Sequence, residues 1–275
     1  MNPFDGKIIL GETRPVEIHL PANYDSKIAH PLLVFLHGYR STALEHQTYF
    51  NLGPKASENG FVYLYPEGIK NVQSERYWKA TDACCDFAGM GLDDVGYLRD
   101  LIRQVKSRVN IDDDKVFLMG HSNGGFMTYR MACEHPELFA GVISASGLTW
   151  LDNAKCKKTG KPLNILHIHS VDDQLALYEG GIFLKNPFPS AEQTVATWQT
   201  NIGCTNTNLA ATGNTYDFTD EVSGIETTEY SDDGASCPAN ASITFWKLVD
   251  AIHTPVYNQA FAQEIFDWCM AHYRV

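Results

Sequence analysis

The chain of 275 residues lacks both a long hydrophobic run and an excess of basic residues. No stretch approaches the roughly 20 apolar residues that a membrane-spanning helix requires. Asp and Glu number 33 against 21 Lys and Arg, which gives a formal charge of −12. Because nucleic acids and anionic membranes are bound by clustered basic residues, this balance argues against both as partners.

Internal repeats, low-complexity tracts and long linkers are also absent. Hydrophobic residues make up 44% of the chain and charged residues 20%, values typical of a folded globular protein. The composition therefore excludes disorder, collagen and coiled coil as the main organisation. We expect a single α/β domain over residues 1–275, although the length alone is compatible with two domains.

None of the seven cysteines forms a Cys-x-x-Cys motif, which argues against a zinc ribbon or a thioredoxin-type site. Cys133 and Cys269 fall in helical patterns, where we expect buried free thiols. The first residues lack the basic and apolar regions of a signal peptide, which fits either a cytoplasmic protein or a mature secreted one. Four cysteines lie in expected loops and are disulfide candidates for an oxidising compartment: Cys84, Cys85, Cys204 and Cys237.

Short apolar runs alternate with longer helical patterns along the chain. Continuous apolar runs are typical of parallel strands that are buried on both faces of a sheet. The expected strands are 31–37, 61–65, 116–119, 141–145, 163–169 and 243–249, and the expected helices are 94–109, 123–134 and 256–271. This alternation predicts a mostly parallel sheet with helices on both faces. We expect antiparallel edge strands in the first 20 residues and an irregular excursion with a short hairpin at about 200–240.

The pattern Gly120-x-Ser122-x-Gly124 follows an apolar strand and precedes a helix, which is the setting of a nucleophile elbow. Such a turn lifts the Ser122 hydroxyl above the sheet, and glycines avoid collisions with the neighbouring backbone. The backbone amide of Asn123, at the start of the helix, can donate to an oxyanion. The alternative is a glycine-rich turn with an idle serine.

A serine nucleophile needs a histidine base, and that base needs a carboxylate to orient it. Where the serine lies on a nucleophile elbow, the acid and then the histidine follow it along the chain. The acid is expected after a late strand, and Asp172 and Asp173 are both candidates after the strand at 163–169. His253 follows the last expected strand and is the candidate base.

A second oxyanion donor is expected from the loop after the strand at 31–37, where we assign the amide of Tyr39. His37 then braces the loop. His121, Trp78 and Phe183 are candidates for an aromatic substrate cleft, with ordinary packing as the alternative for each aromatic side chain. The apolar, turn-rich stretch 179–190 is a candidate rim or small lid.

Several further motifs accompany these residues, and together they resemble one enzyme family. They are Leu36-His37-Gly38, Tyr65-Pro66-Glu67-Gly68, Trp78, the Cys84-Cys85 pair, Asp93-Asp94-Val95-Gly96, 167–181 and 192–198. With Gly120 to Phe126, they make the chain similar over nearly its whole length to α/β-hydrolase serine esterases of carbohydrate esterase family 1. That family includes polyhydroxybutyrate-depolymerase-like, feruloyl and acetyl-xylan esterases.

The resemblance implies an α/β-hydrolase fold without a large cap domain and a triad of Ser122, Asp173 and His253, selecting Asp173 over Asp172. It implies no metal and no organic cofactor. The family's usual Gly and Pro near the acid and its Gly and Trp near the base are missing here. The resemblance also suggests disulfides between Cys204 and Cys237 and between Cys156 and one of the Cys84-Cys85 pair. These bonds favour a secreted or periplasmic protein over a cytoplasmic one.

The expected activity is hydrolysis of short-acyl or aromatic esters through an acyl-enzyme, on a small-molecule or polymer-borne substrate. Polyhydroxyalkanoate depolymerase is the first alternative and serine peptidase the second. A catalytically silent binding protein would be expected to lose a triad member, and none is missing.

Overall fold

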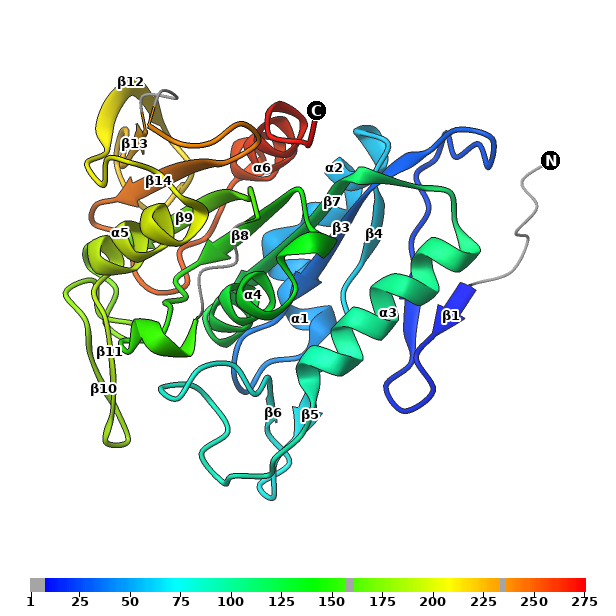
Figure 1. The fold of residues 1–275 in the computed structure, drawn as a ribbon, viewed down its shortest axis with the longest axis horizontal. Helices are drawn as coiled ribbons and strands as arrows, with labels where there is room; N and C mark the ends of the chain where they lie inside the picture. The colour runs from blue at the N-terminus through cyan, green and yellow to red at the C-terminus, as the bar shows by residue number, and fades with distance from the viewer. Residues whose placement is uncertain (1–7, 157–160, 233–235) are drawn as a thin grey trace.

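A computed structural model of the chain describes residues 8–156, 161–232 and 236–275. Its centre is a twisted eight-stranded sheet in the order β12-β13-β14-β9-β8-β7-β3-β4 (Figure 1). The strands of this sheet are β3 (His30–Leu36), β4 (Val62–Leu64), β7 (Ile111–His121), β8 (Gly141–Ala145), β9 (Asn164–Ser170), β12 (Ala210–Tyr216), β13 (Thr227–Ser231) and β14 (Ser242–Leu248). The six strands from β14 to β4 are parallel, as their continuous apolar runs predict.

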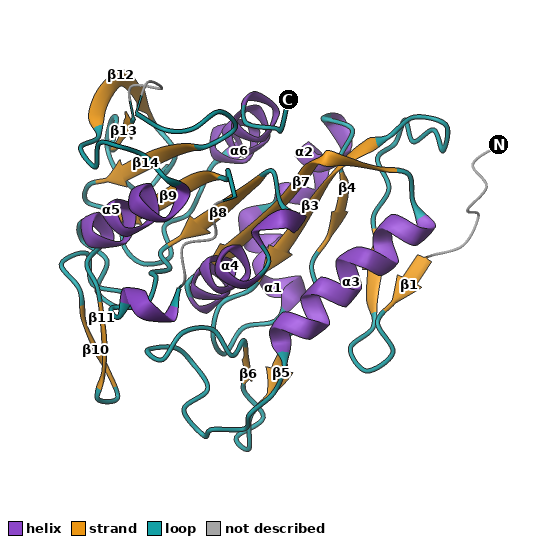
Figure 2. Ribbon diagram, in the orientation of Figure 1, coloured by secondary structure: helices purple, strands orange, loops and turns teal. Residues whose placement is uncertain are grey.

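Helices cover both faces of the sheet (Figure 2). They are α1 (Ala43–Phe50), α2 (Leu52–Glu58), α3 (Asp94–Arg108), α4 (Asn123–Glu134), α5 (Ala191–Ile202) and α6 (Gln259–Ala271), with short 3-10 turns at Pro136–Leu138 and Asn153–Lys155. In β3, Leu32 and Val34 face a core with α3, α4 and α5, whereas Leu33 and Phe35 face a core with α1, α2 and α6. This alternation follows from the two-residue period of a strand.

The expected strands and helices that carry the candidate site residues are all present. α4 begins at Asn123, as its pattern predicts. α3 is capped by Asp93, whose side chain accepts a hydrogen bond from the Gly96 amide. The sequence reasoning missed three helices, α1, α2 and α5. α5 has a capping box formed by Ser190 and Gln193, a signal that could have located its start.

The structure differs from the prediction in two places, the N-terminal strands and the segment at 200–240. β1 (Ile8–Leu10) and β2 (Val16–Ile18) are antiparallel, as expected, but they form a separate two-stranded sheet. The excursion at 200–240 does contain a hairpin, β12–β13, and this hairpin extends the main sheet beyond β14. Two small antiparallel ribbons complete the fold, β5 (Ile69–Lys70) with β6 (Arg76–Tyr77) and β10 (Gly181–Phe183) with β11 (Asn186–Phe188).

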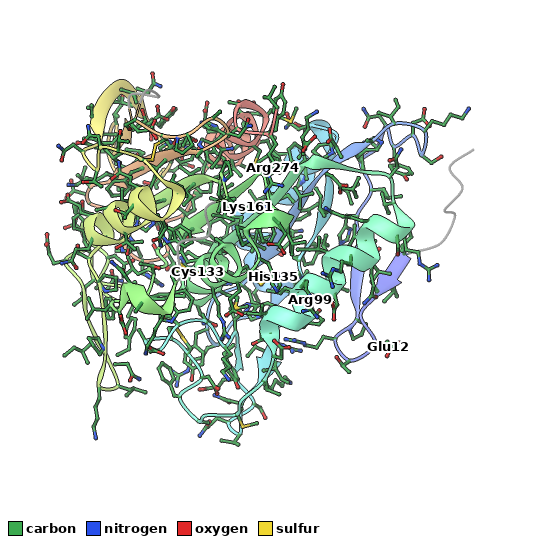
Figure 3. All side chains as sticks on the ribbon, viewed as in Figure 1. Glu12, Arg99, Cys133, His135, Lys161 and Arg274 are labelled. Carbon is green, nitrogen blue, oxygen red and sulfur yellow. A yellow bond between two sulfur atoms is a disulfide. The ribbon has the colours of Figure 1, made fainter. Side chains whose placement is uncertain are left out.

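Three disulfides join six of the cysteines. The predicted Cys204–Cys237 bond is confirmed. The predicted bond between Cys156 and the Cys84-Cys85 pair is wrong, because Cys84 and Cys85 bond each other. Cys156 instead bonds Cys133, which Figure 3 labels on α4, so Cys133 is not the free thiol that its helical pattern suggested. Cys269 is the expected buried free thiol.

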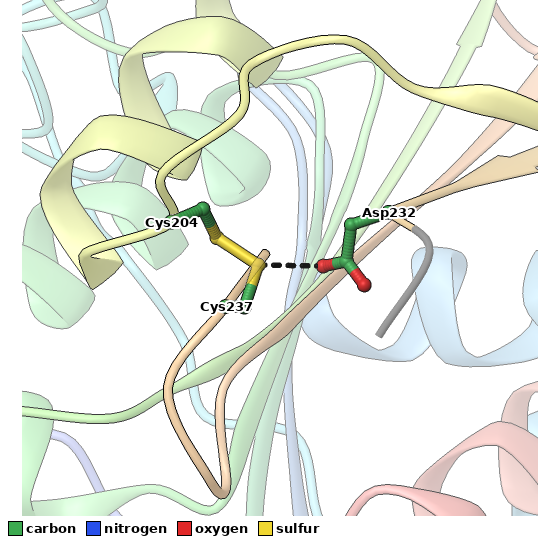
Figure 4. A group of neighbouring side chains, drawn as sticks. All are labelled: Cys204, Asp232 and Cys237. Carbon is green, nitrogen blue, oxygen red and sulfur yellow. Dashed lines mark hydrogen bonds between the residues drawn. A yellow bond between two sulfur atoms is a disulfide. The ribbon is translucent and has the colours of Figure 1, made fainter. Parts of the chain in front are cut away.

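One cluster of potential metal ligands occurs among the described residues, formed by Cys204, Asp232 and Cys237. Figure 4 shows that the two sulfur atoms are bonded to each other, while an Asp232 carboxylate oxygen lies 2.8 Å from the sulfur of Cys237. A thiolate, rather than a disulfide sulfur, is the metal ligand. The disulfide therefore removes two of the three ligands.

Candidate active site

The candidate site residues meet at the carboxyl ends of the parallel strands. Ser122 follows β7, Asp173 follows β9 and His253 follows β14. Ser122 and His253 line one cavity of about 450 Å³. The cavity is also lined by Gly38, Tyr39, Arg40, His46, Cys84, Cys85, Phe87, His121, Phe126, Leu175, Ala176, Phe183, Leu184 and Thr254.

Ser122 occupies a strained turn between β7 and α4. Its backbone φ of 53° and ψ of −120° lie in a region that non-glycine residues rarely adopt. The turn is held by a 2.8 Å hydrogen bond that the Ser122 amide donates to the Ala145 carbonyl. A side chain at Gly120 would meet the Gly124 backbone at 2.2 Å, and one at Gly124 would meet the Leu36 carbonyl oxygen at 2.2 Å. These close approaches explain why the turn requires glycine at both positions.

Asp173 and His253 are brought together from segments 80 residues apart. The His253 Nδ1 lies 2.7 Å from Asp173 Oδ2, and both residues are buried. The other carboxylate oxygen accepts hydrogen bonds from the amides of Leu175 and Ala176 at 2.9 and 2.8 Å. Burial is the largest single influence on the pKa of Asp173 and acts to raise it, but the hydrogen bond and charge of His253, together with His169 and the Leu175 amide, outweigh burial and hold this pKa below its usual value. An ionised Asp173 fixes the proton on Nδ1 of His253 and leaves Nε2 as a base.

His169 provides a further support for the acid. Its Nε2 donates to the Ala176 carbonyl at 2.7 Å and lies 3.5 Å from Asp173 Oδ2. Burial lowers the pKa of His169, so the ring is neutral and carries one N–H donor, which is the Nε2–H that bonds the Ala176 carbonyl. The loop 173–176 is thereby tied to the end of β9.

The loop after β3 is built around His37. Its Nδ1 donates to the Gly38 carbonyl at 2.7 Å and its Nε2 accepts from the Gly68 amide at 2.9 Å. Burial lowers the pKa of His37 to about 4, which keeps the ring neutral for this bracing role. Tyr39 lines the cavity, and its hydroxyl donates to Glu75 at 2.5 Å. Asn123 is the first residue of α4, so its backbone amide has no intrahelical acceptor.

A chain of hydrogen bonds reaches the backbone of His253. His121 Nε2 lies 3.0 Å from the His253 carbonyl, which can only accept, so this nitrogen carries the proton. His121 Nδ1 must then accept from His46 Nε2, 3.0 Å away, and His46 Nδ1 accepts from the Ser41 hydroxyl at 2.6 Å. Burial lowers the pKa of His46 to about 3 and that of His121 well below its usual value, so both rings are neutral.

The remaining expected cleft residues divide into two groups. Phe183 and His121 line the cavity, Phe183 from the β10–β11 ribbon within the expected rim at 179–190. The structure does not bring Trp78 to the cavity. Its indole is fully buried and donates to the His37 carbonyl at 3.0 Å, while its backbone pairs with the Asn123 side chain at 2.7 and 2.9 Å. Trp78 therefore packs beneath the cavity and ties the loop after β3 to the start of α4.

Sequence reasoning missed three parts of the site. His46 lies on an unpredicted helix and had no spacing signal to link it with His121. His169 falls in the expected strand at 163–169, and its position four residues before Asp173 is the only sequence signal of its contact with the acid. The Cys84–Cys85 disulfide lines the cavity, and the adjacency of two cysteines was its only signal.

Comparisons with known proteins identify the family and the fold of this chain. The model of the family described as Esterase PHB depolymerase matches residues 18–195, more than half of the chain. NocK of Nocardia uniformis subsp. tsuyamanensis, whose name describes an esterase, is 30% identical over 63% of this chain and 49% of its own. Feruloyl esterase B of Piromyces equi is 25% identical over 70% of this chain and 36% of its own. The chain spans about half or less of the length of these curated relatives.

A solved acetyl xylan esterase from Aspergillus awamori matches 96% of this chain and 99% of its own, with a TM-score of 0.64 and 16% identity. At that identity the likeness concerns the fold alone, and it confirms the expected α/β-hydrolase architecture. The family match covers the elbow, the His37 loop and the acid at Asp173. The chain belongs to the Esterase PHB depolymerase family.

Proposed function

We propose that this protein is a serine carboxylic-ester hydrolase with Ser122 as nucleophile, His253 as base and Asp173 as the orienting acid. The observation that carries the proposal is the 2.7 Å contact between Asp173 and His253, with His253 and an elbow serine lining one cavity. The names of the relatives, which are esterases, support the same reaction class.

The mechanism is acyl transfer in two steps. His253 Nε2 takes the hydroxyl proton as Ser122 Oγ bonds the ester carbonyl carbon, and the backbone amides of Tyr39 and Asn123 receive the oxyanion. The bond to the alcohol then breaks, and His253 returns the proton to the departing alkoxide. Water attacks the acyl-enzyme with His253 again as base, which releases the acid and restores Ser122. Asp173 stabilises the imidazolium that forms in each step.

The cavity wall supports short-acyl or aromatic esters as substrates. Phe126, Phe183 and Phe87 give the site an apolar and aromatic lining, and Leu175 and Leu184 add aliphatic contacts. Leu184 is 72% exposed, which places an open rim beside the cavity and suits an ester carried by a larger molecule. Polyhydroxyalkanoates are the second candidate substrate, favoured by the description of the matching family.

A substrate panel combined with a Ser122→Ala variant tests the proposal. The panel contains p-nitrophenyl acetate and butyrate, methyl ferulate, acetylated xylan and polyhydroxybutyrate. We expect the wild type to hydrolyse nitrophenyl esters and the variant to lose activity by several orders of magnitude while it stays folded by circular dichroism. Full activity in the variant would refute the assignment. Release of ferulate or acetate, as against hydroxybutyrate, decides between the substrate classes.

We further propose that the chain works as one domain in an oxidising compartment, secreted or periplasmic. One sheet runs through residues from both halves of the chain, and the site needs strands from each. Three disulfides are typical of such compartments. Among the described residues, no helix is both long enough and apolar enough to cross a membrane.

A further inference from the structure

The β10–β11 ribbon stands at the edge of the candidate active site and projects from the body of the molecule (Figure 1). Its base is fixed by aromatic contacts, because Phe183 stacks on the buried Phe188 with 4.4 Å between ring centroids and lies edge-on to Phe126 of α4 at 6.5 Å. Its tip is a two-residue turn of Leu184 and Lys185. The packed base therefore holds the tip at a defined place beside the cavity, which Phe183 and Leu184 both line.

The turn at the tip is unfavourable for the residues that form it. Leu184 has a φ of 44° and Lys185 a φ of 80°. Two-residue hairpin turns with positive φ at both positions are normally built from Asn and Gly, because the Cβ of other residues crowds the backbone there. A chain that needed only the turn would be served better by those residues. The strain therefore indicates that a side chain at the tip has a role beyond folding.

Its position singles out Leu184 as that side chain. Leu184 is 72% exposed to solvent, although it lines the same cavity as Ser122. Ile182 is similarly exposed, but it lies on the opposite face of the ribbon from Phe183, and neither Ile182 nor Lys185 lines the cavity. Leu184 is thus the exposed apolar group of the ribbon that an ester bound in the cavity can reach.

We propose that Leu184 sets the selectivity of the enzyme between short and long esters, by contacting the apolar part of a substrate that extends out of the cavity. A cavity of about 450 Å³ has room for a small ester, which gains little from the rim. A longer acyl or alcohol chain must pass the rim, and each methylene that leaves water against Leu184 contributes to binding. The inference rests on the proposed ester hydrolysis.

Two pairs of esters test the proposal, with kcat/KM measured for each ester. p-Nitrophenyl acetate and octanoate differ in the acyl chain, whereas ethyl and octyl acetate differ in the alcohol. We expect Leu184→Asn to lower the long-to-short ratio of kcat/KM by about fivefold or more in one of the pairs, and that pair shows which part of the substrate passes the rim. Because Asn tolerates positive φ, the same variant should unfold at a higher urea concentration than the wild type.

Two matched controls separate the leucine side chain from the strain of the turn and from exposure in general. Lys185→Gly relieves strain in the same turn, and Ile182→Thr removes an exposed aliphatic side chain from the same ribbon, so both should keep the wild-type ratio. An unchanged ratio in Leu184→Asn for both pairs, or an equal fall in the two controls, would overturn the proposal. A lower urea midpoint in Leu184→Asn would also overturn it, because the turn would then prefer leucine. A wild type that hydrolyses none of these esters refutes the proposed function instead.

Discussion

Asp173 illustrates how much of the site depends on single side chains. One of its oxygens orients His253 and the other closes its own loop through the amides of Leu175 and Ala176. The neighbouring Asp172 has a different contact, because it accepts from the Asp250 amide at 2.7 Å. Both carboxylates therefore join the loop after β9 to the loop after β14, Asp172 at Asp250 and Asp173 at His253.

The first prediction separates these two carboxylates. Asp173→Asn should reduce kcat for p-nitrophenyl acetate by about 10³–10⁴-fold, because an amide facing Nδ1 no longer fixes the His253 tautomer. Asp172→Asn, as the matched control, should reduce it by about tenfold or less. Steady-state kinetics on both variants checks this, and equal losses would contradict the assignment of Asp173 as the acid.

The second prediction concerns the hydrogen-bond chain from Ser41 to His253. His46→Leu leaves His121 Nδ1 without its donor, so the His253 backbone loses part of its support. We expect kcat to fall by roughly tenfold, the equivalent of one hydrogen bond of about 1.4 kcal/mol. His46→Gln keeps a donor and should recover much of the rate. A loss confined to KM would show that His46 acts on substrate binding instead.

The residues that sequence could identify are those whose chemistry depends on chain order. Ser122, Asp173 and His253 each follow a predicted strand, and the order of acid and base is characteristic of this fold. His46 could not be found in this way. Its place in the site arises from tertiary contacts with His121 and Ser41, and it has no local pattern that distinguishes it from a surface residue.

At the scale of elements, the β7–α4 turn has the least tolerance for change. Its two glycines lie where backbone segments pass within 2.2 Å of an added carbon. Sequence predicted α4 to the residue and a strand before it, because a buried apolar run, two glycines and a helical pattern agree, although β7 is longer than the expected strand at 116–119. It missed α1 and α2, which are short. It predicted a short hairpin at about 200–240 but did not place β12–β13 in the main sheet, because seven largely exposed residues in β12 provide no apolar alternation.

The third prediction tests the elbow. Gly124→Ala should prevent folding to a soluble active protein, since backbone at Leu36 and His37 cannot move away from the added methyl group. Gly213→Ala is the control, because it meets nothing within 4 Å and carries only the cost of a φ of +91°. That cost is about 1–2 kcal/mol. Soluble yield and urea unfolding measure both, and a stable, active Gly124→Ala protein would contradict the proposed packing.

At the scale of the whole molecule, buried neutral histidines couple stability to pH. The pKa of His37 is lowered to about 4 and that of His46 to about 3, in both cases by burial. In the unfolded chain these rings titrate near 6.5. Between about pH 4 and 6.5 the unfolded state therefore binds more protons than the folded state, so acid favours unfolding in this window.

The fourth prediction follows from the larger number of protons that the unfolded state binds in this pH window. The free energy of unfolding in urea should be constant between about pH 7 and 8 and fall as the pH drops from 6.5 to 4. Each ring contributes up to about 1.4 kcal/mol per pH unit. His46→Asn should reduce the slope in this window. A stability that rises on acidification through the same window would contradict the neutral state of these rings.

The fifth prediction counts thiols over the whole chain. With three disulfides and Cys269 free, titration in denaturant without reductant should find one thiol, and reduction should raise the count to seven. In the native protein Cys269 should not react, since it is fully buried and burial raises its pKa. Cys269→Ser should show none before reduction. Three or more thiols in the unreduced chain would contradict the observed pairing.

The sheet order has a consequence for biosynthesis. β14 lies between β9 and β13, and the loop with His253 follows it, so the last strand in sequence takes an interior place in the sheet. A nascent chain displays its elbow serine about 130 residues before its base is translated. The proposed site is therefore complete only after β14 has been inserted between β9 and β13.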